Sequence, residues 1–217
     1  MEFIPFPKIP RLMRDVIVTE KIDGTNASII IDDTGHNMLV GSRNRYITVE
    51  EDNYGFARWC NENFRELLKL GPGRHYGEWW GNGIQRGYDV PEKRFSLFNV
   101  ERWRDSSVRP ACCGVVPMLY SGPFNLAIFE AALADLKEHG SKAAPGFNNP
   151  EGIVIYHTAS RQMFKQTIER DAAPKSLPNL TDPKILAAGV DAARWTADQR
   201  RILEATQGPL PVVNKVS

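Results

Sequence analysis

Lys21, a lysine that could act as a nucleophile, lies in the segment VTEKIDGTNASIII, residues 18–31. It stands between two β-branched runs whose side chains should be buried. An unperturbed lysine amine has a pKa of about 10.4, so a nucleophilic lysine needs burial, nearby cations or a metal ion that disfavours its charge. The apolar runs on either side of Lys21 could supply that burial, which makes it a candidate nucleophile. The alternative is a lysine that extends from a strand end into solvent, with Asp23 as its counter-charge.

Two carboxylates lie in segments that could contribute to the same site. Glu78 stands beside Trp79 and Trp80 in HYGEWWG. Burying a carboxylate among such aromatic side chains costs free energy unless it binds a hydroxyl, a metal ion or a cation. Glu151 precedes a β-branched run, and its spacing to Lys165 fits two antiparallel strands that bring an acid and a base to one end of a sheet. The alternatives are a Glu78 on the solvated face of an ordinary strand and an exposed Glu151–Lys165 ion pair, which would stabilise little.

Basic residues accompany these segments. In GSRNRY, Arg43 and Arg45 alternate and are expected to share one face of a strand. Between residues 86 and 109, cations alternate with aromatic residues, a combination suited to phosphate contact and base stacking. The net charge is only +1, from 27 Lys and Arg against 26 Asp and Glu, so a nucleic-acid partner would have to meet a local patch. The alternative for 101–109 is a mixed, solvated surface.

The elements that must position these residues are short strands and two helices. Apolar residues at i, i+3 and i+4 from Phe56 to Leu68 predict an amphipathic helix that ends before Gly71, and residues 124–140 predict a second helix. We expect the first three strands to form an antiparallel meander and the last two to form a closing hairpin. The predicted strands are 15–20, 27–32, 37–42, 75–81, 94–103, 151–157 and 161–169.

The composition is ordinary for a soluble globular protein. The pattern of predicted strands and helices indicates a mixed α+β class, with an antiparallel sheet against which a helix packs. Its 217 residues are divided into a domain at 1–170 and a proline-punctuated linker with short helices at 171–217. Three cysteines, without the spacing of a zinc site, favour a reducing compartment. The sequence shows neither the apolar core of a signal peptide nor a membrane span, so we expect a cytoplasmic protein without a membrane partner.

Six segments taken together resemble the motifs of covalent lysyl-nucleotidyl transferases. EKIDGTN, SRNR, YGEWWG, RFSLFNV, EGIVI and MFKQT follow the order and rough spacing of motifs I, Ia, III, IIIa, IV and V of ATP-dependent polynucleotide ligases and mRNA capping enzymes. The start EKIDGTN is most similar to the RNA ligase branch that includes phage RNA ligase 2. The resemblance covers about residues 15 to 170 and implies an antiparallel-sheet nucleotidyltransferase domain, ATP-grasp-like, without an OB-fold domain.

The resemblance also implies a role for each matching position. Lys21 would attack the α-phosphate of ATP, forming lysyl-AMP and expelling pyrophosphate, while Lys165 would stabilise the charge that builds on that phosphate. Glu151 would assist the binding of Mg²⁺ or Mn²⁺. The other implied contacts are Arg43 with phosphate or ribose, Glu78 with the ribose hydroxyls, Phe98 with adenine, Glu20 and Ile22 with the nucleotide, Asp23 with Lys21, and Asn26 with the metal shell or the nucleic-acid end.

The implied activity is that of an ATP-dependent RNA ligase joining 3′-hydroxyl and 5′-phosphate ends through lysyl-AMP and an adenylylated 5′ end. The partner would be RNA, with a nicked duplex or a DNA/RNA hybrid left open, and the protein is expected to be a monomer. The chain departs from the pattern at Met163, where motif V usually has a lysine, and at 171–217, which is too short for an OB-fold domain. A minimal DNA ligase, a 5′-adenylyltransferase and an inactive nucleotide-binding module stay open as alternatives.

Overall fold

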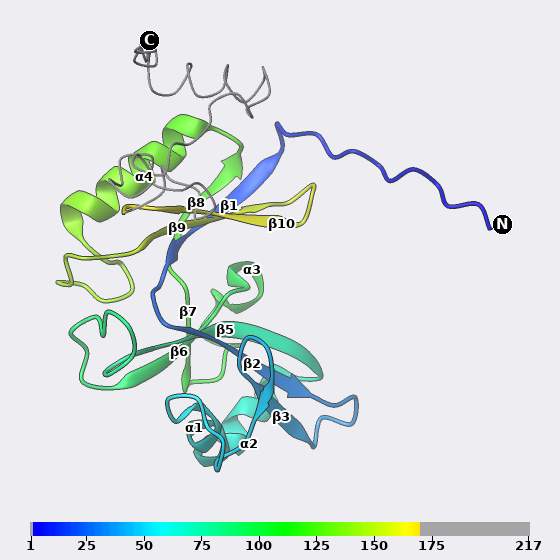
Figure 1. Ribbon diagram of the computed structural model, residues 1–217, viewed down its shortest axis with the longest axis vertical. Helices are drawn as coiled ribbons and strands as arrows, with labels where there is room; N and C mark the ends of the chain where they lie inside the picture. The colour runs from blue at the N-terminus through cyan, green and yellow to red at the C-terminus, as the bar shows by residue number, and fades with distance from the viewer. Residues whose placement is uncertain (1, 170–217) are drawn as a thin grey trace, which may run out of the picture. The chain divides into compact units, whose positions relative to one another are not determined.

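A computed structural model describes residues 2–169 of the chain. These residues form two β-sheets with helices packed against them (Figure 1). Within them, no helix is both long enough and apolar enough to cross a membrane. The predicted linker and short helices at 171–217 lie outside the described residues.

The first sheet has four antiparallel strands in the order β10-β9-β1-β8. Its central strand β1 is buried on both faces, which explains its continuous β-branched sequence. Val16 and Val18 pack against Phe129 and Leu136 of the helix α4, whereas Ile17 points to the opposite face. The elements are β1 (Asp15–Lys21), β8 (Met118–Pro123), α4 (Leu126–His139), β9 (Gly152–His157) and β10 (Gln162–Thr167).

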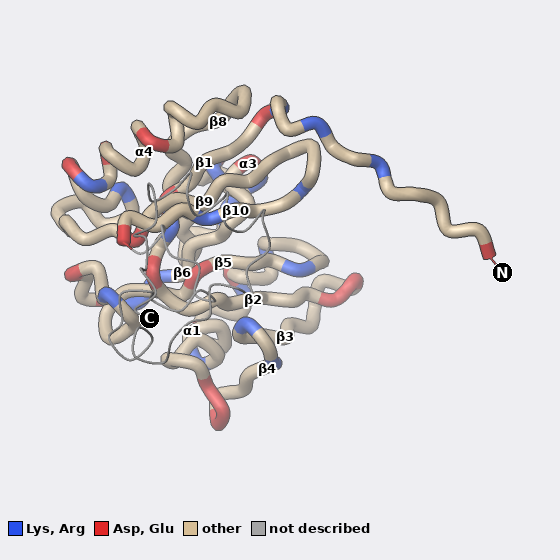
Figure 2. The backbone as a smooth tube through the Cα atoms, turned by 45° about the horizontal axis from the view of Figure 1, so that its top comes forward, with Lys and Arg blue, Asp and Glu red and all other residues tan. Residues whose placement is uncertain are grey.

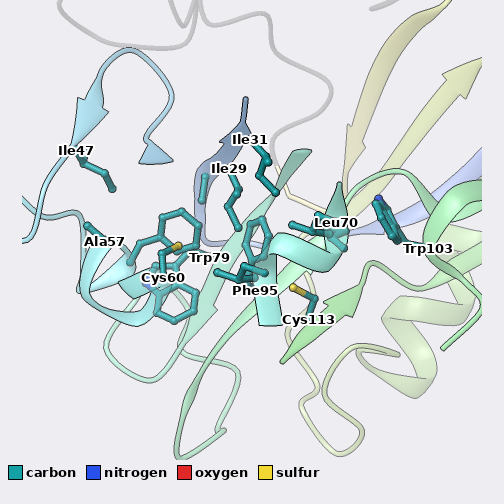
Figure 3. Packing of buried hydrophobic residues seen from close by; sticks show 14 of the residues in the cluster. Ile29, Ile31, Ile47, Ala57, Cys60, Leu70, Trp79, Phe95, Trp103 and Cys113 are labelled. Carbon is teal, nitrogen blue, oxygen red and sulfur yellow. The ribbon is translucent and has the colours of Figure 1, made fainter. Parts of the chain in front are cut away.

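The second sheet has six strands in the order β4-β3-β2-β5-β6-β7, antiparallel except for the β6–β7 pair. Its core packs Ile29, Trp79 and Phe95 against Ala57 and Cys60 of the helix α1 (Figure 3). The strands are β2 (Thr25–Ile31), β3 (Met38–Gly41), β4 (Tyr46–Ile47), β5 (Gly73–Gly81), β6 (Lys93–Leu97) and β7 (Cys113–Val115). The helices are α1 (Phe56–Glu62), α2 (Phe64–Leu67), the 3₁₀ turn η1 (Leu68–Leu70) and α3 (Val100–Trp103).

The predicted meander of the first three strands is wrong in its pairing. β1 pairs with β8 and β9, whereas β2 pairs with β3 and β5, so the chain passes from one sheet to the other between Lys21 and Thr25. Gly24 allows this passage, because a Cβ at that position would lie 2.5 Å from the backbone oxygen of Trp79. A buried cluster that includes Ile17 and Trp80 then joins the two sheets.

Two further predictions need correction. The single helix expected from Phe56 is interrupted at Asn63, which has φ −104° and ψ 14° and donates its side-chain amide to the Trp59 carbonyl at 2.9 Å. The strand expected at 94–103 ends at Leu97, because Asn99 accepts a hydrogen bond from the Arg102 amide at 3.1 Å and begins α3. Strands β7 and β8 were not predicted, while α4 and the β9–β10 hairpin confirm the prediction.

Candidate active site

Lys21 is the last residue of β1, and its amine binds a carboxylate from a distant segment. Nζ donates to Glu151 Oε2 at 2.6 Å across 130 residues of sequence. The contact follows from strand register, since Lys21 lies opposite Gly152 and Glu151 precedes Gly152 directly. The two side chains are 23% and 17% exposed, so this is a partly sheltered pair and not a lysine surrounded by solvent.

The backbone at Glu151 is held by the β9–β10 pairing. The Glu151 carbonyl accepts a hydrogen bond from the Ile168 amide at 2.9 Å. Gly152 has φ 153°, and a Cβ there would lie 2.2 Å from the Gln166 carbonyl oxygen. Only a glycine fits this close approach, and it fixes where the Glu151 side chain begins.

Glu78 supplies a second carboxylate from the other sheet. It lies opposite Asn26 in the β2–β5 pairing and accepts hydrogen bonds from the Gly24 amide at 3.1 Å and from Asn26 Nδ2 at 3.0 Å. Burial raises the pKa of Glu78 to about 7, while Lys21 lowers it and Glu151 raises it further through their charges. These three groups therefore form one electrostatically coupled set.

The Asp23 carboxylate does not pair with Lys21, contrary to the expectation from the sequence. Its Oδ2 accepts a hydrogen bond from Arg86 Nε at 3.0 Å, and its backbone amide donates to the Tyr88 hydroxyl at 2.8 Å. Burial raises the pKa of Tyr88, which keeps the hydroxyl neutral. The counter-charge of Lys21 is Glu151, and Asp23 belongs to a separate contact with the loop between β5 and β6.

Glu20 and Ile22 flank Lys21, but the side chains of both residues make their contacts away from Lys21. Side chains alternate along a strand, and the Glu20 carboxylate accordingly lies away from Lys21, accepting hydrogen bonds from Ser141 Oγ at 2.6 Å and the Lys142 amide at 2.7 Å. Burial raises the pKa of Glu20, which is 1% exposed. Ile22 is buried in the cluster that joins the sheets. A nucleotide contact by Glu20 would therefore have to come from its backbone.

Lys165 lies on the same face of the first sheet as Lys21. It is opposite Val154, which is opposite Thr19, and Thr19 and Lys21 are two residues apart on β1. The side chain of Lys165 is exposed, and the Glu151–Lys165 ion pair considered from the sequence does not form, because Glu151 binds Lys21. Met163 occupies the same face and is 66% exposed.

Arg43 and Phe98 come from the second sheet. Arg43 is exposed in the connection between β3 and β4, so the predicted strand carrying Arg43 and Arg45 on one face is wrong. Phe98 directly follows β6, is half-buried against the cluster that joins the sheets, and donates its amide to the Tyr76 carbonyl at 2.9 Å. Within the described residues, neither side chain forms a hydrogen bond or ion pair with Lys21, Glu78 or Glu151.

The donor set suits a hard divalent ion bound together with phosphate oxygens. Within residues 2–169, no three His, Cys, Asp or Glu side chains lie close enough to form a metal cage. Mg²⁺ commonly uses one or two carboxylates plus the phosphates of its substrate, so a cage is not required. Glu151, as a partly exposed carboxylate beside Lys21, fits the role of the protein ligand.

Two cavities lie away from this charged set. One of about 730 Å³ is lined by Tyr54, Trp59, Trp79 and Lys93, on the helix-covered side of β5. Another of about 390 Å³ is lined by residues that include Trp80 and Ser96. Neither includes Lys21, Glu78 or Glu151. We place the site at the charged set because the Lys21 amine binds a carboxylate there, whereas Lys93 in the first cavity donates to the Tyr54 carbonyl. Figure 2 marks the acidic and basic positions along the backbone of both sheets.

Comparison with known proteins decides the family. A family model described as RNA ligase matches residues 14–169, nearly all of the described chain. The chain belongs to the RNA ligase family. No curated protein matches it. The α+β class with mainly antiparallel sheets is confirmed by the fold of solved RNA ligases.

Those solved RNA ligases come from Naegleria gruberi. A variant solved with ATP and Mn has a TM-score of 0.53 at 22% identity, covering 71% of this chain and 50% of that chain. A second variant, with AMP and Mn, has a TM-score of 0.51 at 22% identity, covering 71% and 49%. This RNA ligase family member thus spans about half the length of the structures it matches, and the likeness concerns the fold.

Proposed function

We propose that the chain is an ATP-dependent RNA ligase that carries AMP on Lys21. The observation that carries the proposal is the Lys21–Glu151 pair at 2.6 Å, with Glu78 in the same electrostatic set, in a member of the RNA ligase family. The Naegleria gruberi RNA ligases of similar fold were solved with ATP, AMP and Mn. We extend ATP and a divalent metal ion, Mg²⁺ or Mn²⁺, to this chain on that basis.

In the first step the amine of Lys21 attacks the α-phosphorus of ATP. The N–P bond forms while the P–O bond to pyrophosphate breaks, and the nitrogen loses its proton. Glu151 Oε2 is within hydrogen-bond distance of Nζ, which is the geometry required to accept that proton. A bound divalent ion would neutralise part of the phosphate charge, and Lys165, on the same sheet face, would add a cation.

The later steps follow from the chemistry of an activated phosphate. AMP passes from Lys21 to a 5′-phosphate end, and a 3′-hydroxyl then attacks that end, sealing the strand and releasing AMP. Family membership supports RNA as the substrate. A nicked duplex or DNA/RNA hybrid, a monomeric state and a cytoplasmic location stay predictions.

Labelling of the protein tests this proposal. Incubation with α-labelled ATP and Mg²⁺ should give an acid-stable labelled protein, and Lys21→Ala should remove the label. Lys69→Ala is the matched control, because Lys69 is an exposed lysine on η1 that pairs with Glu66. Labelled Lys21→Ala would refute the assignment of the nucleophile.

The alternatives give different products in the same assay. ATP binding without label indicates an inactive nucleotide-binding module. A labelled protein that accumulates adenylylated 5′ ends without sealing is a 5′-adenylyltransferase. Nicked substrates with RNA or DNA on each side of the nick separate an RNA ligase from a minimal DNA ligase, because 2′-hydroxyl contacts distinguish the two.

A further inference from the structure

Arg86 connects three segments that surround the candidate active site. It lies in the loop between β5 and β6, and its side chain is 19% exposed. Nε donates to Asp23 Oδ2 at 3.0 Å, and Nη1 donates to both the backbone oxygen and Oδ1 of Asn149, at 3.0 and 2.7 Å. Nη2 lies 3.6 Å from Glu169 Oε2. One guanidinium thus uses three of its nitrogens on three separate segments.

Each of these segments carries a group of the proposed reaction nearby. Asp23 is two residues after Lys21, and Asn149 is two residues before Glu151. Glu169 is two residues past the end of β10, the strand that holds Lys165. The planar, rigid fork of arginine suits such bridging, because its donors have fixed relative directions.

The loop around Arg86 is built at a conformational cost. Ile84 and Tyr88, on either side of Arg86, are 0% and 1% exposed and anchor the loop in the core. Non-glycine residues with positive φ are strained, and such residues persist where the surrounding structure imposes that conformation. In this loop they are Gln85 (φ 47°), Tyr88 (φ 56°) and Asp89 (φ 53°).

We propose that Arg86 is a positioning residue that sets the placement of Lys21 relative to Glu151. Its charge already faces the carboxylates of Asp23 and Glu169, so it is not a free cation awaiting a phosphate. By tying the turn after Lys21 to the segment before Glu151, it restricts the motion of both. This inference rests on the proposed adenylylation of Lys21.

The rate of the first step separates positioning from phosphate binding. We would measure single-turnover formation of labelled lysyl-AMP against ATP concentration for the full chain and for Arg86→Met. A displacement of about 1 Å at a reacting group can cost about 10²-fold, so we expect the maximal rate to fall by about 10- to 100-fold. The ATP concentration at half-maximal rate should change by less than about 3-fold, because uniform binding is retained.

Two variants provide the comparison. Arg65→Met removes the same charge from an exposed position on α2 and should leave the rate unchanged. Arg86→Lys should recover part of the rate, since one ammonium group can reach Asp23 but cannot span to Asn149 as well. The double variant Asp23→Asn/Arg86→Met should have a maximal rate within about 2-fold of that of the slower single variant. The two effects should not add, because the two residues act through one contact.

Several results would overturn the inference. An unchanged maximal rate for Arg86→Met, or full recovery by Arg86→Lys, would do so. A raised half-maximal ATP concentration at an unchanged maximal rate would show that Arg86 binds phosphate. If Arg86→Met does not fold, Arg86→Lys and Asp23→Asn are read by the same criteria. Absence of label in the unmodified chain would instead refute the proposed function.

Discussion

Replacing Glu78 with glutamine should make the stability of the fold less dependent on pH. The carboxylate is 7% exposed, and burial raises its pKa from 4.5 to about 7. Glutamine keeps the shape of the side chain and one acceptor oxygen for the Gly24 amide. The Asn26 amide can turn its oxygen toward the new NH₂ group, so the charge is removed at a small cost in hydrogen bonds.

The magnitude follows from proton linkage. The pKa of Glu78 is higher in the folded state than in the unfolded state, so its stabilising contribution is complete below about pH 4.5 and is lost as the pH rises through 7. One pKa unit corresponds to about 1.4 kcal/mol, which makes the loss about 3 kcal/mol by pH 8. The Glu78→Gln variant carries no such group and should keep that free energy.

Urea unfolding of both proteins at a series of pH values between 4.5 and 8 measures this effect. Other titrating groups, including Glu20, whose pKa is also raised by burial, are shared by both proteins and cancel in the difference. The difference in free energy of unfolding should change by about 3 kcal/mol across the range, with the variant gaining at high pH. Parallel pH profiles for the two proteins would show that Glu78 stays ionised in the fold and that its burial is compensated.

Three further substitutions test the site and its supports. Glu151→Gln should slow lysyl-AMP formation by about 10²- to 10⁴-fold in a single-turnover assay, since it removes the group placed to accept the Lys21 proton. The thermal midpoint of unfolding of this variant should stay nearly unchanged. Gly152→Ala should lower the free energy of unfolding in urea by more than about 2 kcal/mol, because its Cβ would meet the Gln166 carbonyl at 2.2 Å. Glu20→Ala should cost about 1–3 kcal/mol in the same assay at pH 7 by leaving buried donors unpaired, with a smaller loss for Glu20→Gln.

The sequence predicted the elements better than their partners. Strands such as β1 and β2 are visible as β-branched runs, and α4 is visible from its apolar spacing and from Gly140, which ends it at φ 78°. The pairing of β1 depends on β8 and β9, more than 90 residues further on. No local pattern specifies such a pairing, so the shortest connection was predicted, and the meander was wrong.

The same reason explains the errors at the site. Residue types and surroundings mark Lys21, Glu78 and Glu151 as candidates in the sequence, but they indicate Asp23, two positions away, as the partner of Lys21. Strand register provides Glu151 instead. For Glu20 a usable signal did exist, because alternation along a strand places its side chain on the face opposite to Lys21.

The sequence indicates Arg86 only as one of the cations between residues 86 and 109 that could contact phosphate. Its bridging role depends on where three other segments end, which no local pattern specifies. The site brings together one group from each sheet and one from a loop: Lys21 ends a strand of the first, Glu78 lies within a strand of the second, and Arg86 joins their surroundings. The passage between the sheets at Gly24 is too tight for any side chain. Lys21 meets Glu151 within the first sheet, and Glu78 joins the set only when the second sheet has formed, so the chemistry of the amine depends on both sheets.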